Sequence, residues 1–407
     1  MRAAWLACCA IGFSPIAHAQ ELSFADALAR AAEGPSVEAG RASARAAELA
    51  VGPAGQLPDP ELVLGVENVP VSGINRYRLD RDEMTMQRIG IMQEMPNGLG
   101  ARRAMAEAQA ERASVDLDLA RLEARLGAAQ AWIALHYAQR RTATLAVLLN
   151  EAQASAAAAR ARLSSGAGSV DDAIAAEIEA ARLEDRVATL HAAAVRARAE
   201  LRRWIGDAAD EDLSASAPTF EIDPEHMRQH LRRHPELAAF NADEDAAEAG
   251  LALARAERRP DWSWELSYGR RDPSFGDMAS VEVRVGLPLF QPWRQGPLVA
   301  ARRADLARVG AERSAVEREH ASMLEGWLAE YAATSSNLDR ARDIRLPLAR
   351  RRAASAMGAF GAGTTSTSDV IEARRGLLEA ELELYDLEER RALIGATLTL
   401  QYAEQTP

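Results

Sequence analysis

The sequence predicts a mainly α-helical protein that also contributes β-strands to a membrane β-barrel shared between several copies of the chain. Three observations predict this fold class: short segments in which apolar and polar residues alternate, long uninterrupted helical segments beside them, and a repeat of the whole arrangement in the second half. An alternating segment has one apolar and one polar face, as the strands of a membrane barrel with a wet lumen do.

The first 19 residues have the pattern of a secretory signal peptide. Arg2 supplies the positive charge, an apolar run extends from Trp5 to Ile16, and Ala17-His18-Ala19 provides a cleavage site. Both cysteines, Cys8 and Cys9, lie in this segment, so we expect neither disulfides nor thiolate metal sites in the mature chain. Lipidation of Cys9 remains an open alternative.

The rest of the composition excludes several classes of function. No later segment approaches the ~20 apolar residues of a membrane-spanning helix, so membrane insertion would have to use strands. The formal net charge of −12 argues against nucleic acid as a partner. The sequence contains no nucleophile-elbow, phosphate-loop or zinc-protease motif, and we therefore expect neither an enzyme nor a cofactor.

The first repeat, residues 20–206, is predicted to contain two short helices, two strands and a long helical hairpin. The strands are expected at about 62–68 and 84–95, where apolar residues recur at every second position. The helices are expected at 22–32 and at about 36–51, the second ending at Gly52-Pro53. The hairpin is expected at about 101–205, and helices of this length are typical of coiled coils.

A linker at 207–224 leads to the second repeat, residues 225–407. Its strands are expected at about 261–268 and 281–290, and its helical hairpin at about 298–402. The two repeats match most closely at the breaks within the hairpins. There, Gly166, Ser169 and Asp172 have the same spacing as Gly363, Ser366 and Asp369, 197 residues later. A repeat of this size indicates a duplicated architecture.

Four strands cannot close a barrel, and an open sheet edge cannot lie in lipid, so several copies must pool their strands. Two copies would give eight strands and three would give twelve. The residues expected to face lipid are Trp262, Trp264, Leu266, Tyr268, Val281, Val283 and Val285. Those expected to face the lumen are Glu67, Glu265, Glu282 and Arg284. The alternative is a soluble β-layer that buries the aromatic residues against the helices.

Several of these features together carry a resemblance to a known family. They are the two-fold repeat, the paired G-x-x-S-x-x-D breaks, and the segment from Leu231-Arg-Arg-His-Pro-Glu-Leu to Arg-Arg-Pro-Asp261. The chain, from Leu22 to Tyr402, resembles the TolC-type outer membrane efflux proteins. Two short segments, Glu67-Asn-Val-Pro-Val-Ser-Gly73 and Gln93-Glu-Met-Pro-Asn-Gly98, resemble the branch that exports heavy-metal cations.

The resemblance implies a homotrimer. Its twelve-stranded barrel would cross the outer membrane, in contact with outer membrane lipid, and continue into an antiparallel α-helical barrel in the periplasm. A periplasmic membrane-fusion (adaptor) protein and an inner-membrane resistance–nodulation–division pump would be its partners. The expected function is the exit duct of a tripartite efflux system for heavy-metal cations. The alternatives are a duct for drugs, solvents or secreted proteins, and a periplasmic coiled-coil scaffold without a channel.

The hairpin tips carry the residues expected to select and gate. In a trimer Asp171, Asp172 and Asp369 would form rings of carboxylates, which set cation preference. A helix-capping role is the alternative, because the helix dipole favours acidic residues in a first turn. The expected adaptor contacts are the turn residues Gly166, Ser169, Gly363 and Ser366.

Three histidines, His226, His230 and His234, are spaced four residues apart and would lie on one helix face. Two such histidines can share a metal ion, which makes His226 and His230 the candidate metal ligands. An ordinary exposed helix face is the alternative that we favour.

Overall fold

The computed structural model describes residues 21–403, so the predicted signal peptide lies outside the described part of the chain. The described residues form two compact units. We call the first the helical unit; it comprises the residues up to Gly34, Leu122–Pro224 and the residues from Glu325 onward. We call the second the strand-bearing unit; it comprises Pro35–Arg121 and Glu225–Leu324.

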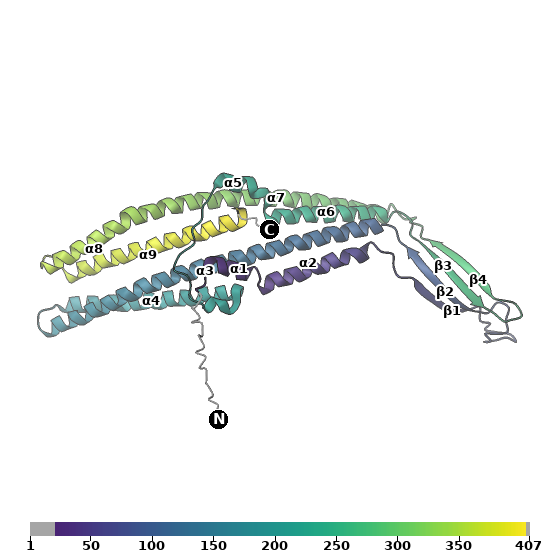
Figure 1. Cartoon of the computed structure of the whole chain (residues 1–407), viewed down its shortest axis with the longest axis horizontal. Coiled ribbons are helices and arrows are strands. Elements are labelled where there is room, and N and C mark those ends of the chain that lie inside the picture. Colours follow the sequence, from purple (N-terminus) through teal and green to yellow (C-terminus); the bar gives the residue numbers. More distant parts are fainter. Residues whose placement is uncertain (1–20, 404–407) are drawn as a thin grey trace, which may run out of the picture. The chain divides into compact units, whose positions relative to one another are not determined.

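The strand-bearing unit contains one antiparallel sheet with the strand order β1-β2-β3-β4 (Figure 1). The strands are β1 (Glu61–Glu67), β2 (Met86–Met95), β3 (Trp262–Arg270) and β4 (Met278–Val285). Ile91 of β2 pairs with Leu266 of β3, and Leu266 pairs with Val281 of β4. The central β2–β3 pair therefore joins the two halves of the sequence, while β1 and β4 form the edges of the sheet.

Besides the short helix α5 (Pro224–His230) and the 3₁₀ turn Leu231–Arg233, four longer helical segments accompany the sheet in this unit. They are α2 (Pro35–Ala54), α6 (Pro235–Ala256) and the first parts of α3 (Leu99–Ser164) and α7 (Gln295–Arg340). Small residues allow close packing, since Gly40 of α2 lies against Leu117 of α3, and Leu251 and Ala254 of α6 pack on Val299 of α7. In the sequence, α2 and α3 therefore flank the β1–β2 pair, and α6 and α7 flank the β3–β4 pair. The packing within each helix pair holds the two ends of the corresponding strand pair together.

The helical unit contains two helical hairpins. The first joins α3 to α4 (Val170–Ile205), and the second joins α8 (Leu346–Gly361) to α9 (Thr367–Leu398) (Figure 1). Its core is built around the fully buried Trp132, whose indole Nε1 donates to the carbonyl oxygen of Leu22 at 3.2 Å. The remaining elements are α1 (Phe24–Ala31), a 3₁₀ turn (Gly206–Asp210) and a π-helical end (Thr399–Ala403).

Several element boundaries differ from the predicted ones. The predicted strand 281–290 begins earlier, at Met278, and residues 286–290 do not continue it. The N–H of Gly286 still bonds the carbonyl oxygen of Asp261 at 2.8 Å, in register with β3, but Pro288 has no N–H for the next ladder bond. Likewise β2 begins at Met86 instead of residue 84, because Thr85 bonds the Asn68 carbonyl through its hydroxyl.

Two prolines occupy unexpected positions within helices. The predicted stop at Gly52-Pro53 is wrong, since α2 continues to Ala54; Pro53 lies in the last turn, where one missing bond is tolerated. A π-helical turn, Ala341–Arg345, separates α7 from α8, and the N–H of Leu346 bonds the Ala341 carbonyl five residues back. Pro347 follows directly and has no N–H, so the wider π turn shifts the helical hydrogen-bond pattern just before the residue that cannot donate.

Among residues 21–403, none of the helices combines the length and the apolar character that crossing a membrane requires.

Candidate functional site

The polar face of the sheet carries a network of charged side chains with Arg88 of β2 at its centre. Arg88 lies opposite Gly65 of β1 and Gly269 of β3, so neither neighbour presents a side chain that would crowd the guanidinium. Its Nη1 donates to Glu67 Oε1 at 2.5 Å, and its Nη2 donates to Glu265. The side chain of Arg88 is only 17% exposed, although the sheet is a single layer.

Glu265 of β3 is shared between two arginines. Its side chain is 3% exposed, and it accepts from Arg88 and, at 3.2 Å, from Arg284 Nη2 of β4. Arg284 also binds Glu282 at 2.7 Å. A Cβ at Gly90 would lie 3.1 Å from Glu265 Oε1 and 2.8 Å from the Cβ of Ser267. The absence of a side chain at Gly90 therefore leaves room for the Glu265 carboxylate to reach Arg88.

We call Glu67, Arg88, Glu265, Glu282 and Arg284 the charged network. Two cations and three carboxylates leave one net negative charge per chain on this face. The structure brings together all four residues that the sequence predicted to face the lumen. Arg88 was missed as a site residue; its alternation placed it on the polar face, but only the strand register shows that it connects the two repeats.

The opposite face of the sheet is apolar and exposed in the single chain. Six of the seven residues predicted to face lipid are exposed, and Trp264 is half-buried. They are joined by exposed residues of β1 and β2, namely Leu62, Leu64, Ile89 and Ile91. Because Trp262 and Tyr268 are exposed in the described chain, the alternative of a β-layer that buries its aromatic residues against helices is not observed.

The two hairpin tips share a motif but differ in their hydrogen bonds. At each tip a glycine has positive φ, 76° at Gly166 and 71° at Gly363, which a residue with a Cβ adopts less readily. Ser169 caps α4 by accepting from the N–H of Asp172 at 3.3 Å, and Ser366 caps α9 in the same way. A serine therefore caps the returning helix at both tips.

Only the second tip completes a capping box. The Asp369 carboxylate accepts from the Ser366 backbone N–H at 3.1 Å and from the Ser366 and Thr365 hydroxyls at 2.7 Å each. These bonds stabilise the charged form and lower the pKa of Asp369 to about 2. Asp171 and Asp172 make no such side-chain bonds among the described residues. The expected capping role is thus observed for Asp369, and the gating role remains a prediction for all three.

The histidines do not form the single helix face that their spacing predicted. His226 and His230 stack on α5 (Pro224–His230) with ring centroids 4.0 Å apart, and His230 Nδ1 donates to the His226 carbonyl at 2.8 Å. His234 instead lies beyond a 3₁₀ turn, at the N-cap of α6. The prediction that His234 shares one helix face with His226 and His230 is therefore wrong.

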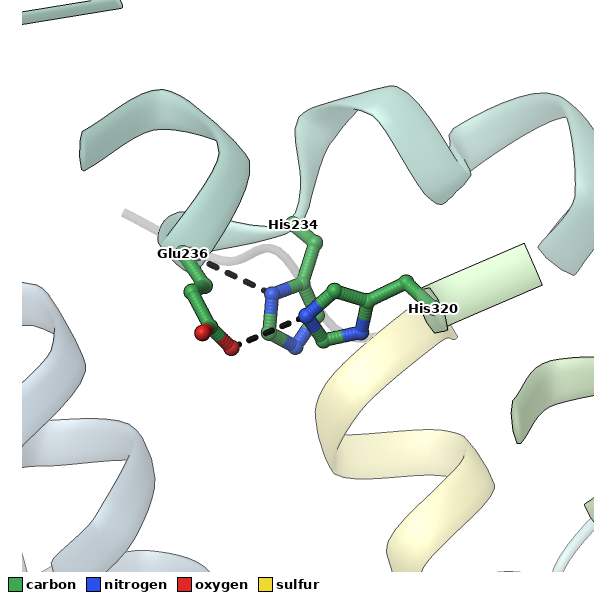
Figure 2. A group of neighbouring side chains, drawn as sticks. All are labelled: His234, Glu236 and His320. Carbon is green, nitrogen blue, oxygen red and sulfur yellow. Dashed lines mark hydrogen bonds and ion pairs between the residues drawn. The ribbon is translucent and has the colours of Figure 1, made fainter. Parts of the chain in front are cut away.

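His234 meets His320 of α7 and Glu236 of α6 (Figure 2). The two imidazoles have centroids 4.1 Å apart, and His320 Nε2 lies 2.9 Å from Glu236 Oε2. His234 Nδ1 accepts from the Glu236 N–H at 3.2 Å. Burial, helped by the neighbouring His320, lowers the pKa of His234 to about 4. No sequence spacing signalled this group, because His320 lies 84 residues from Glu236.

Comparisons with known proteins agree on one family and one fold. Residues 227–401 match the family model described as outer membrane efflux protein. The chain is 27% identical over 333 residues to the cobalt-zinc-cadmium resistance protein CzcC of Cupriavidus metallidurans, covering 80% of this chain and 76% of that protein.

Two solved structures show the same fold at low sequence identity. A membrane protein from Pseudomonas aeruginosa superposes with a TM-score of 0.81 at 16% identity, covering 93% of this chain and 90% of that one. The CmeC outer membrane channel of Campylobacter jejuni superposes with a TM-score of 0.77 at 12% identity, covering 94% and 87%.

Proposed function

We propose that this chain is a member of the outer membrane efflux protein family, whose model matches residues 227–401, and that it forms the outer membrane exit duct of a tripartite efflux system for heavy-metal cations. The observation that carries the cation assignment is the similarity to a cobalt-zinc-cadmium resistance protein along three quarters of that protein's length. The duct assignment also accounts for the sheet, which has one apolar face, one charged face and two open edges.

The open edges support a homotrimer. Within the described chain β1 and β4 each pair on one side only, and an unpaired strand edge in lipid leaves backbone groups unsatisfied at several kcal/mol each. If β4 of one copy pairs with β1 of the next, three copies close a twelve-stranded barrel with no edge left. The apolar face would then meet outer membrane lipid, and the charged network would line the lumen.

The charge of the lumen suits a cation. In a trimer the charged network would repeat three times, each copy adding one net negative charge, and rings of carboxylates favour cations in a pore.

The two hairpin tips of each chain would lie at the periplasmic end. There, Asp171 and Asp172 would contribute to the gate, and the turns at Gly166 and Gly363 would contact the adaptor protein, with the inner-membrane pump beyond it.

The proposal is tested by deleting the gene and measuring growth with zinc, cadmium, cobalt, copper and silver salts and with a panel of drugs and solvents. We expect sensitivity to at least one metal and its reversal by the gene supplied in trans. Unchanged growth with every metal would contradict the metal assignment, and sensitivity to drugs or solvents alone would favour a duct for those compounds. Purified protein that gives no conductance in a planar bilayer would favour a scaffold without a channel.

A further inference from the structure

The group formed by His234, Glu236 and His320 has the composition of a metal site. Two imidazoles and one carboxylate are a set of ligands that zinc accepts, and three protein ligands leave a fourth position open for water. All three come from two helices of the strand-bearing unit: His234 caps α6, Glu236 lies in its first turn, and His320 projects from α7 (Figure 2).

The geometry is close to what an ion requires. One ligand atom from each residue lies within 4.8 Å of the other two, and the pair formed by His320 Nε2 and Glu236 Oε2 is already at 2.9 Å. Zinc bonds of about 2.0–2.1 Å place tetrahedral ligand atoms about 3.3 Å apart, so the site has to contract by an ångström or so. The Glu236 side chain, half-exposed and unbranched, can supply that movement, whereas the buried imidazoles stay in place.

The environment of the imidazoles favours holding a ligand in one position. His234 is 3% exposed and His320 is 4% exposed, so their rings are fixed by packing before any ion arrives. The Glu236 carboxylate reaches solvent and provides a path for an ion to enter. Arg232, two residues before His234, is paired with Glu317 at 3.0 Å, which offsets its repulsion of a cation.

From this arrangement we propose that His234, Glu236 and His320 bind one divalent cation of the zinc class per chain. The ion is held by the protein and is distinct from any ion that passes through the duct. It would join α6, the helix that precedes β3, to α7, the helix that follows β4. The bound ion would therefore clamp the two ends of the second strand pair.

The protons in the site are compatible with this assignment. An ionised carboxylate can only accept, so His320 Nε2 donates its hydrogen to Glu236 Oε2. For an ion to bind at Nε2 that hydrogen has to leave, and the neutral ring then carries its single hydrogen on Nδ1. His234 Nδ1 already presents a lone pair, now used in a 3.2 Å bond with the Glu236 N–H, and an ion at Nδ1 would replace that bond.

The test uses the full-length protein, purified in detergent, stripped with a chelator and titrated with zinc chloride in a calorimeter. We expect one zinc per chain, no comparable binding of magnesium, and a rise in the thermal unfolding temperature with zinc. The variants are His320→Gln and His234→Asn; asparagine keeps an N-cap acceptor and removes the imidazole. Each should weaken zinc binding by at least 10–100-fold, roughly the loss seen when even outer-shell partners of a metal are removed.

The double variant His226→Asn/His230→Asn is the matched control, since it removes the other neighbouring histidine pair, and it should bind zinc as the wild type does. Equal zinc binding by wild type and His320→Gln, loss of binding in the control, or no binding of one zinc per chain would each overturn the proposal. Unaltered helix content by circular dichroism excludes misfolding of a variant. The readout is independent of transport, so a failure here leaves the duct proposal intact, and the reverse also holds.

Discussion

Replacing Arg88 by methionine tests whether the charged network holds the two repeats together. Methionine keeps most of the volume and the apolar stem of arginine but removes both of its charge-assisted hydrogen bonds. Glu265, which is almost fully buried, would then keep only Arg284 at 3.2 Å. The substitution therefore leaves a buried carboxylate with one of its two cations.

The expected loss follows from the exposure of the two partners. The bond to the buried Glu265 is of the kind that contributes about 1.5–3 kcal/mol, as hydrogen bonds to charged groups do. The bond to Glu67, whose side chain is 39% exposed, adds at most about 1 kcal/mol, because solvent screens it. We expect a decrease of about 2–3 kcal/mol in the free energy of unfolding. The about 3–5 kcal/mol typical of a fully isolated buried charge is too much, since Arg284 remains.

The measurement is a double-mutant cycle of Arg88→Met, Glu265→Gln and the two combined, in lipid vesicles, with guanidinium unfolding followed by tryptophan fluorescence. Trp262 and Trp264 lie in β3, and the other tryptophans are replaced by phenylalanine in the background protein so that the signal reports the sheet. The double variant should be less destabilised than the sum of the single variants by at least about 1 kcal/mol. Additivity within about 0.5 kcal/mol would refute the coupling and with it the role of Arg88 as the centre of the network.

Two further predictions concern the helical hairpins. The pKa of Asp369 is lowered to about 2 by the capping box, so its contribution to stability is present above about pH 4 and is lost as the pH falls towards 2. The difference in melting temperature between wild type and Asp369→Asn should therefore shrink over that interval. In α3, the indole of Trp204 occupies the space beside Gly127, and a Cβ on residue 127 would lie 2.3 Å from the ring. Gly127→Ala should therefore lower the melting temperature, although alanine has the higher helix propensity. Gly310→Ala is the control: the space around Gly310 is open, so this substitution should raise the melting temperature.

Much of the fold was predictable because its signals are local. A period of two in the strands, helical segments without breaks, and glycines at the hairpin tips each act within a few residues. The hairpin expected at about 101–205 is formed by α3 and α4, and α4 ends at Ile205. The resemblance to the efflux family and the predicted fold class are confirmed by the family model and by the solved structures of the same fold. The predicted division into two repeats with a linker remains a prediction.

What the sequence did not predict depends on contacts between distant residues. Arg88 and Glu265 are 177 residues apart, and no local pattern shows which strand of the second repeat lies beside β2. The prediction for the histidines was wrong for a related reason. Their spacing of four predicted one continuous helix, but a 3₁₀ turn before Pro235 interrupts it, and His234 lies against His320 instead.

The hairpin tips show that one motif can have two roles. Asp172 and Asp369 hold the same place after a capping serine, but the Asp369 carboxylate is used in three hydrogen bonds at the start of α9. The carboxylates of Asp171 and Asp172 make no comparable bonds in the described chain; Asp171 is exposed and Asp172 is half-buried. If the tips set cation preference, the first tip should carry most of it.

This difference gives a direct comparison in a planar bilayer with a potassium chloride gradient. The double variant Asp171→Asn/Asp172→Asn should reduce the cation-to-anion permeability ratio, read from the reversal potential, because it removes two carboxylates per chain from the tip. Asp369→Asn, which removes one carboxylate already engaged in a cap, should change the ratio less and the thermal stability more. Equal effects of the two variants on the permeability ratio would mean that the capping bonds do not prevent Asp369 from influencing passing ions. If neither variant changed the ratio, cation preference would be set elsewhere, and the charged network of the sheet would be the next region to test.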